Sequence, residues 1–328
     1  MPTSSIYPYQ RRYLRDTSRY KAAMWARQTG KTYMSGERLR APIRYYGGKG
    51  RMLGRLLPLI PAGGKPYVEP YLGGGSVFFA RAPAPVEVIN DLDGDIVTLM
   101  RALQDREQFE SLRHRLMWTP YARDEFARAI ETLNNPDASP VDRAWAKFVA
   151  CNQGMSGQHK TVGRWGRAFV SYQGCAGNTN KWLMRLSMLD AWRWRLMRAQ
   201  IDHRDALEVI RYWDGEDAVI YCDPPYVHDT RKDRNVYRVE ASDDHHAQLV
   251  QTLLKCKGAV VLSGYDHEIY QPLADAGWDV VRIDTVCHAA ARRRGSKLRG
   301  AGAAMQHVPR TEVIWRNPRA VQKALYGG

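Results

Sequence analysis

The feature that most constrains this chain is a short apolar run, residues 218–222, which ends in Asp223-Pro224-Pro225-Tyr226. An apolar run of this length bounded by prolines predicts a buried strand. In open α/β sheets ligands bind beyond the carboxyl ends of the strands, so we expect an active site at this turn. Two adjacent prolines fix two φ angles and remove two amide donors, which leaves carbonyl acceptors beside a carboxylate and an aromatic ring. Such a turn suits a flat ring that carries an amino group, although an ordinary turn with a solvated aspartate has the same composition.

Glycines and a second carboxylate predict a nucleotide-type loop upstream. A short strand at 67–70 runs into three glycines at 73–75, and a helix is expected directly afterwards. Glycine suits this loop because a bound nucleoside approaches the backbone more closely than a Cβ allows. The next predicted strand, 86–90, ends at Asp91, where a carboxylate is placed to accept hydrogen bonds from ribose hydroxyls.

Charge narrows the class of partner. The chain has 328 residues, long enough for one large domain or two modest ones, and its 49 Lys and Arg against 34 Asp and Glu give a formal net charge of +15. That excess favours a polyanion. Nucleic acid is favoured over a membrane because no long apolar segment or amphipathic Lys-rich helix is present, although a basic surface can also serve solubility alone.

Cysteine and histidine usage gives no sign of a disulfide framework or a metal site. The five cysteines are odd in number, scattered and without C-x-x-C spacing, which favours a reducing cytoplasm. The N-terminus has no apolar signal core, so secretion is not expected. His245 and His246 are adjacent and do not share a helix face, so we expect no metal.

Residues 1–40 differ in texture from the rest. The stretch 27–32, Arg-Gln-Thr-Gly-Lys-Thr, ends like a P-loop, but Trp25 stands where a P-loop has a glycine. The wider stretch 7–32 resembles the opening of phage terminase large subunits. We expect no ATP hydrolysis from this basic leader, and the open alternative is an arm that adds phosphate contacts.

The middle of the chain, about 98–200, is predicted to be helical. Strands alternating with helices are predicted again from 199, with further strands at 259–265, 278–286 and 311–315. Two polar segments favour DNA contact, since amides pair with adenine and arginines with guanine or phosphate. The alternative for each is a solvated loop. The candidate DNA-binding residues are Asn152, Gln153, Lys160, Arg164, Arg167, Arg292, Arg293, Arg294, Lys297 and Arg299.

A series of short motifs from residue 43 onward matches one known family. In chain order they are Tyr45-Tyr46-Gly47-Gly48-Lys49, residues 69–78, Asn90-Asp91, Asp205, Asp223-Pro224-Pro225-Tyr226 and residues 310–315. Over nearly all of 43–318 the chain resembles the Dam-like, D12 class of adenine-N6 DNA methyltransferases. It departs from that family at Ala206, where many relatives have an aromatic residue, and in its leader.

The resemblance implies a Rossmann-like methyltransferase sheet with an inserted, mainly helical target-recognition domain. The catalytic domain would comprise 41–105 and 200–328, and the recognition domain 106–199. The implied catalytic residues are Asp223, Pro224, Pro225 and Tyr226. The implied S-adenosylmethionine-binding residues are Tyr45, Lys49, Glu69, Gly73, Gly74, Gly75, Ser76, Asp91, Asp205 and Asp223.

The implied reaction is metal-free methyl transfer to a flipped-out adenine of double-stranded DNA, in the cytoplasm of a bacterium or of a phage-infected host. Three alternatives stay open: methylation of cytosine at N4, a packaging ATPase fragment, and a non-catalytic DNA-binding protein. The motifs do not predict the DNA target sequence, a restriction partner, or whether the protein is a monomer or a homodimer.

Overall fold

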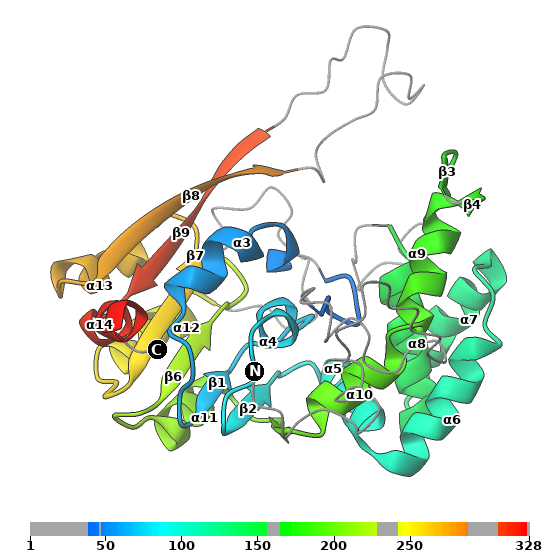
Figure 1. The fold of residues 1–328 in the computed structure, drawn as a ribbon, viewed down its shortest axis with the longest axis horizontal. Helices are drawn as coiled ribbons and strands as arrows, with labels where there is room; N and C mark the ends of the chain where they lie inside the picture. Colours follow the sequence, from blue (N-terminus) through cyan, green and yellow to red (C-terminus); the bar gives the residue numbers. More distant parts are fainter. Residues whose placement is uncertain are drawn as a thin grey trace, which may run out of the picture.

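One central sheet organises the molecule (Figure 1). The computed structural model describes residues 39–45, 47–155, 165–172, 174–227, 242–287 and 308–326. The strands of the central sheet are β1 (Tyr67–Glu69), β2 (Glu87–Asn90), β5 (Ala199–Asp202), β6 (Val219–Cys222), β7 (Ala259–Gly264), β8 (Asp279–Cys287) and β9 (Val308–Arg316).

The strand order is β5-β2-β1-β6-β7-β9-β8. Neighbours from β5 to β7 run parallel, whereas β9 runs antiparallel to both β7 and β8. The order changes direction between β1 and β6, and open α/β sheets bind nucleotides at such a switch point. The predicted Rossmann-like sheet and the terminal strand pair are therefore confirmed.

Helices cover both faces of the parallel strands, which is why β1, β2, β6 and β7 are buried along their whole length. Alternate side chains point to opposite faces: Ile220 packs toward α11 and α12, and Val219 and Tyr221 toward α3 and α14. The helices of these two layers are α11 (Ala206–Trp213), α12 (Asp243–Leu253), α13 (Gln271–Asp275), α3 (Leu53–Leu56), α4 (Ser76–Ala80) and α14 (Pro318–Tyr326).

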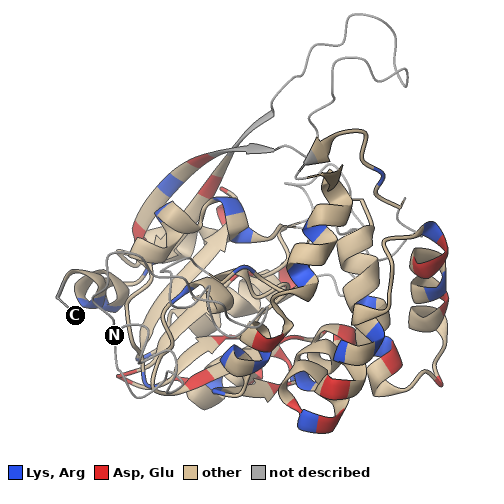
Figure 2. Cartoon of the chain, turned by 45° about the vertical axis from the view of Figure 1, so that its right-hand side comes forward, with Lys and Arg blue, Asp and Glu red and all other residues tan. Residues whose placement is uncertain are grey.

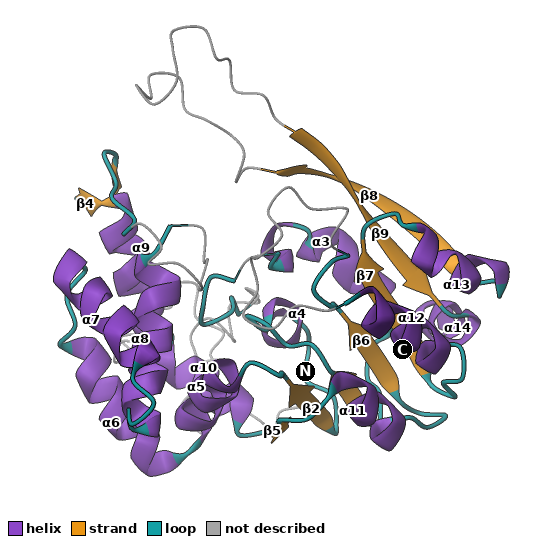
Figure 3. Ribbon diagram, turned by 180° about the vertical axis from the view of Figure 1, so that it is seen from behind, coloured by secondary structure: helices purple, strands orange, loops and turns teal. Residues whose placement is uncertain are grey.

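Residues 106–199 are mainly helical, as expected, and lie beside the β5 edge of the sheet, opposite the β8–β9 end (Figures 1 and 3). Together with the preceding α5 their helices are α5 (Gly94–Gln104), α6 (Arg106–Met117), α7 (Arg123–Asn134), α8 (Pro140–Gln153), α9 (Gly177–Leu186) and α10 (Leu189–Leu196). A short hairpin of β3 (Ser171–Tyr172) and β4 (Cys175–Ala176) precedes α9.

The core is continuous across the predicted domain boundary at 105/106. Phe78 and Ile89 of the sheet layer belong to the same buried cluster as Phe148 and Trp192 of the helical region. Asp105 both ends α5 and caps α6. Division into two domains stays a prediction, but the helical region packs as part of the same body. In the described ranges no helix is long and apolar enough to cross a membrane.

Candidate active site

Asp223 lies directly after β6 and contacts Lys49, which begins the 3-10 helix η2 (Lys49–Arg51). The Lys49 Nζ atom lies 2.5 Å from Asp223 Oδ1 and 3.2 Å from Glu312 Oε1 of β9. The Lys49 side chain is only 3% exposed, whereas that of Asp223 is 21% exposed. A buried ammonium thus lies between two carboxylates, one of which opens toward solvent.

Burial and charge pairing have opposite effects on the pKa of Asp223 and on that of Lys49. Burial raises the pKa of Asp223 to about 6, since the effect of losing water outweighs the stabilising charge of Lys49, and Glu312 adds repulsion. Burial favours the neutral form of Lys49, but Asp223 and Glu312 together raise its pKa above the usual value. Lys49 is therefore a permanent cation, and Asp223 is ionised at neutral pH and protonates in mild acid.

Tyr226 is held in place by the same group of charges. Its hydroxyl donates to Glu312 Oε1 at 2.6 Å and accepts a hydrogen bond from Lys49. Ser263 Oγ also donates to Glu312 Oε1, at 2.8 Å. The Tyr226 ring is 5% exposed, and its centroid lies 4.3 Å from that of Tyr265. Glu312 therefore orients both Lys49 and, in the turn after β6, Tyr226.

The glycine loop after β1 closes around Tyr45. A Cβ at Gly73, where φ is +52°, would lie 3.0 Å from the Tyr45 ring, and a Cβ at Gly74 would meet the Tyr45 Cβ at 3.0 Å. Gly75, with φ +72°, caps α4, and a Cβ there would lie 2.9 Å from the Phe79 ring. The sequence argument assigned these glycines to close nucleoside approach; the packing of Tyr45 and Phe79 is a second reason for them.

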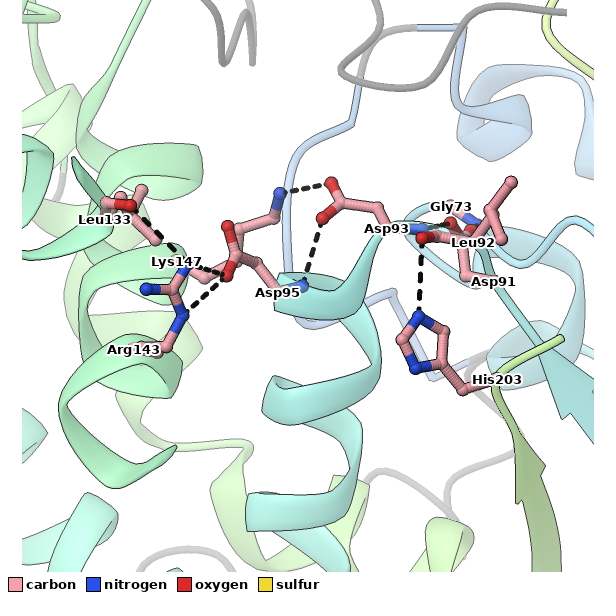
Figure 4. Close-up of polar contacts among 9 residues, drawn as sticks. All are labelled: Gly73, Asp91, Leu92, Asp93, Asp95, Leu133, Arg143, Lys147 and His203. Atoms are coloured by element: carbon pink, nitrogen blue, oxygen red, sulfur yellow. Dashed lines mark hydrogen bonds and ion pairs between the residues drawn. The ribbon is translucent and has the colours of Figure 1, made fainter. Parts of the chain in front are cut away.

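Asp91 follows β2 and faces the glycine loop (Figure 4). Its Oδ2 accepts from the Gly73 amide at 2.7 Å, and its Oδ1 accepts from the Asp93 amide at 2.8 Å. Burial raises the pKa of Asp91 to about 6, although these two amides and the charge of Lys147 act in the opposite direction. Each carboxylate oxygen retains a lone pair for a further donor.

Two adjoining cavities join these turns. The larger, about 270 Å³, is lined by Tyr45, Gly73, Asp91, Asp205 and Asp223, among others. The smaller, about 40 Å³, is lined by Tyr45, Lys49, Glu69, Gly73, Gly74, Ser76 and Asp223. The structure therefore brings together every residue predicted to bind the cofactor except Gly75, which lines neither cavity.

Two of these residues have further structural bonds. Asp205 caps α11, with Oδ1 accepting from the Leu207 amide at 2.8 Å. Glu69 is buried and accepts from the Tyr67 hydroxyl at 2.5 Å, and burial raises its pKa to about 8. Glu69 is thus mainly protonated at pH 7, and the carboxylates that act on the Lys49 charge are Asp223 and Glu312.

Sequence reasoning missed three residues of the site. Tyr71 and His245 line the larger cavity and are bonded to each other, with the Tyr71 hydroxyl 2.8 Å from His245 Nε2. Glu312 belongs to a stretch that the family resemblance covered, but no role was assigned to it. The position of Tyr71 in the glycine loop was a usable signal, whereas His245 reaches the cavity only through the placement of α12.

The predicted DNA-binding residues are placed differently from one another. Asn152 and Gln153 are buried, and the prediction that they read base edges is not supported by this placement. Asn152 Nδ2 donates to the Pro42 carbonyl at 3.0 Å, and Gln153 Nε2 to the Pro120 carbonyl at 2.9 Å. An amide beside unpaired backbone groups satisfies them instead of facing a ligand.

Arg167 is exposed, with its guanidinium 5.4 Å from the Phe169 ring centre. The other candidates lie outside the described residues: Lys160, Arg164, Arg292, Arg293, Arg294, Lys297 and Arg299. In the part of the chain that is described, Figure 2 shows basic and acidic positions intermixed along the helices. Charge alone therefore does not mark a DNA-binding face there.

A switch-point cavity bordered by a glycine loop, a buried acid after β2 and a proline-rich turn after β6 is typical of α/β enzymes that bind a nucleoside cofactor. Residues 45–275 match the D12 class N6 adenine-specific DNA methyltransferases, and the chain belongs to that family. The resemblance inferred from the motifs is confirmed. The terminase-like part of that prediction is not supported, and residues 7–32 lie outside the described residues.

Two relatives are similar over part of their length. The chain is 26% identical over 188 residues to a DNA N-6-adenine-methyltransferase of Escherichia phage P1, which covers 57% of this chain and 24% of that protein. It is 33% identical over 70 residues to the type II methyltransferase M1.LlaDCHI of Lactococcus lactis subsp. cremoris, which covers 21% of this chain and 24% of the relative. The chain thus spans about a quarter of the length of these relatives.

Among solved structures, the rRNA methyltransferase AviRa from Streptomyces viridochromogenes aligns with a TM-score of 0.28 at 13% identity, over 84% of this chain and 85% of that one. Among the described residues no group of three or more His, Cys, Asp or Glu side chains is arranged to hold a metal ion. The expectation of a metal-free reaction stays a prediction.

Proposed function

We propose that this protein transfers a methyl group from S-adenosylmethionine to the exocyclic N6 of adenine in double-stranded DNA. The observation that carries the proposal is the position of Asp223, which lines both cavities where a nucleoside cofactor would bind and is still 21% exposed, so that a second substrate can reach it. Membership of the D12 class supports adenine as the acceptor. When bound, S-adenosylmethionine would supply the methyl group from its sulfonium: the bond to N6 forms as the sulfur–methyl bond breaks, S-adenosylhomocysteine is left, and N6 gives up one proton.

The residues of the two cavities fit that cofactor. We assign the ribose to Asp91, whose two oxygens each keep an acceptor position, and the adenine ring to the end of the larger cavity near Asp205. The smaller cavity, with Lys49 and Glu69, would take the methionine end. A nucleoside-sized cavity of about 270 Å³ next to a small polar one supports this orientation.

Asp223 and the Pro224 carbonyl would prepare the adenine amino group for attack. The lone pair of that nitrogen is conjugated with the ring, so hydrogen bonds that favour a pyramidal nitrogen make it a better nucleophile. Lys49 already bonds Asp223 Oδ1, so we assign the amino group to Oδ2. Positioning and electrostatics then account for most of the catalysis. Lys49 keeps Asp223 ionised, so that its carboxylate can accept a hydrogen bond.

The target adenine would have to leave the DNA stack, because N6 of a paired base cannot reach the methyl group. Flipping costs a few kcal/mol. The predicted stacking on Tyr226 would offset about 1–3 kcal/mol of that cost. The hydrogen bonds from Tyr226 to Glu312 and from Lys49 to Tyr226 support this role, since they fix the ring beside Asp223.

For DNA contacts we retain Lys160, Arg164, Arg167 and the basic residues of segment 289–308. We no longer include Asn152 and Gln153, whose buried amides hold backbone groups. The phage relative supports a bacterial or phage-infected cytoplasm as the site of action. We propose no ATPase role for residues 1–40.

The test is product identification. Unmethylated duplex DNA is incubated with the full chain and S-adenosylmethionine carrying a deuterated methyl group, then digested to nucleosides for mass spectrometry. We expect labelled N6-methyldeoxyadenosine, and none with Asp223→Ala. Labelled N4-methyldeoxycytidine would favour the alternative acceptor, and an unlabelled digest from folded protein would reject methyl transfer to DNA.

A further inference from the structure

Helix α8 belongs to the helical region, yet two of its basic residues reach the turn that carries Asp91 (Figure 4). Lys147 Nζ donates to Asp93 Oδ2 at 2.8 Å, and the two side chains are 1% and 2% exposed. One turn earlier on the same helix, Arg143 pairs with Asp95 at 2.6 Å. A lysine is rarely buried this completely unless its charge has a defined partner.

The Lys147 pair continues directly into the cofactor site. Asp93 donates its backbone amide to Asp91 Oδ1 at 2.8 Å, and Asp91 Oδ2 accepts from the Gly73 amide at 2.7 Å. Asp93 Oδ1 also accepts from the Asp95 amide at 3.0 Å, which makes Asp93 the N-cap of α5. An unbroken series of bonds therefore runs from α8 through the Asp91 turn to the glycine loop.

The other end of α8 supports the opposite wall of the same cavity. Asn152 Oδ1 accepts from the Arg44 amide at 3.3 Å, and Asn152 Nδ2 donates to the Pro42 carbonyl at 3.0 Å. The backbone held in this way leads into Tyr45, whose ring covers Gly73. One helix thus holds both the turn that carries Asp91 and the segment that carries Tyr45.

We propose that Lys147 is a positioning residue for the cofactor: from the helical region it holds Asp93, and through Asp93 it fixes the turn that presents Asp91 to the ribose. This inference rests on the proposed function, because it assumes that Asp91 binds S-adenosylmethionine. Lys147 lines neither cavity, so it holds the turn through its bond to Asp93 and reaches Asp91 itself only through its charge.

The charge of Lys147 has a separate, measurable consequence. Asp91 must be ionised to accept two ribose hydroxyls, and its pKa is raised to about 6 by burial and by Asp93, while Lys147 lowers it. The other charged or titratable groups around this turn are Asp95 with Arg143, the buried thiol of Cys151 on α8, His203 beyond Leu92, and Asp205 across the cavity. Loss of the Lys147 cation would raise the pKa of Asp91 further, so cofactor binding would be lost at higher pH.

The experiment is calorimetric titration of the full chain with S-adenosylmethionine between about pH 5.5 and 8.5. The wild-type affinity should fall as the pH drops through a midpoint set by Asp91. For Lys147→Met we expect that midpoint to rise by about one pH unit, and hence the affinity near pH 6, where half of the wild-type Asp91 is ionised, to fall about fivefold. The matched control is Arg143→Met, which removes a neighbouring cation from the same helix and should leave the midpoint unchanged.

A second pair of variants guards against misfolding of the single mutant. The pair consists of the single variant Asp93→Asn and the double variant that adds Lys147→Met. Neither leaves a buried Asp93 carboxylate without its cation, and the double variant should show the higher midpoint. Equal midpoints in this pair, or equal midpoints for Lys147→Met and Arg143→Met, would overturn the inference. Failure of the wild-type chain to bind S-adenosylmethionine at any pH would instead overturn the proposed function and the inference with it.

Discussion

Asp223 and Asp91 follow two parallel strands of the same sheet, β6 and β2, and burial raises the pKa of each to about 6. The two carboxylates differ in the groups that stabilise their negative charge. Asp223 contacts the buried ammonium of Lys49 directly. Asp91 accepts from two backbone amides, and Lys147 bonds the neighbouring Asp93 rather than Asp91 itself. A direct ion pair keeps a carboxylate ionised, which suits the role proposed for Asp223 as acceptor of a reacting amino group. Backbone amides fix the orientation of a carboxylate, which suits the ribose-binding role proposed for Asp91.

The largest effect should come from Asp223→Ala. We expect methyl transfer to fall by about 10³-fold or more, because the amino group loses its charged acceptor, while DNA binding changes little. Methyl incorporation into duplex DNA measures the first, and a DNA-binding titration the second. Ready turnover by this variant would show that the paired carboxylate is not the reacting one.

Lys49→Met tests whether the direct cation sets the ionisation of Asp223. The wild-type pKa of about 6 predicts that kcat/KM falls as the pH drops below about 6, since protonated Asp223 no longer accepts from the amino group. Without the ammonium the pKa of Asp223 rises, so this acidic limb should move upward by about 1–3 pH units. The control is Arg51→Met, an exposed basic residue of the same short helix, measured at saturating DNA. Superimposable profiles for the two variants would contradict the pairing.

Asp91→Ala tests the amide-held member of the comparison. Loss of two charge-assisted hydrogen bonds to the ribose should weaken S-adenosylmethionine binding by about 10- to 100-fold, as measured by calorimetry. At saturating cofactor, the turnover number should recover more fully than in Asp223→Ala. An unchanged dissociation constant would reject the ribose role.

The smallest effect should come from removing residues 1–38. These residues include the Gly-Lys-Thr stretch and lie outside the described residues, and the described side chains that line the two cavities all come from residue 45 onward. Methyl transfer should therefore persist, and wild-type protein should release no phosphate from ATP. Loss of methyl transfer by a truncated chain with unchanged thermal unfolding would assign the leader a role in the reaction.

The local sequence pattern was enough to predict much of the fold and many of the residues that line the two cavities. Mainly apolar runs next to glycine or proline marked β6 and β7, because strands buried on both faces carry mostly apolar side chains. Gly73 and Asp91 were predicted from the position of each at a strand end, which the α/β architecture places at one edge of the sheet.

Long-range pairing was beyond local pattern. The ion pair of Lys49 with Asp223 joins residues 174 positions apart, and Lys49 was expected only against the cofactor. Asn152 has the composition of a base-reading residue, but its burial under the 39–45 segment depends on how α8 packs. Amide side chains satisfy backbone groups and base edges with the same atoms, so composition cannot separate the two roles.

By itself, the sequence determined the class of sheet, the proline-rich turn after β6 and the family, since strand ends, glycine positions and an acid-Pro-Pro-Tyr turn are local features. Only the tertiary structure decided how the charges of that turn are balanced, by placing Glu312 of β9 beside Lys49 and Tyr226, and how α8 reaches the Asp91 turn through Lys147. The physical reason is that the ionisation of a buried group depends on every charge within a few ångströms, and folding alone brings those charges together.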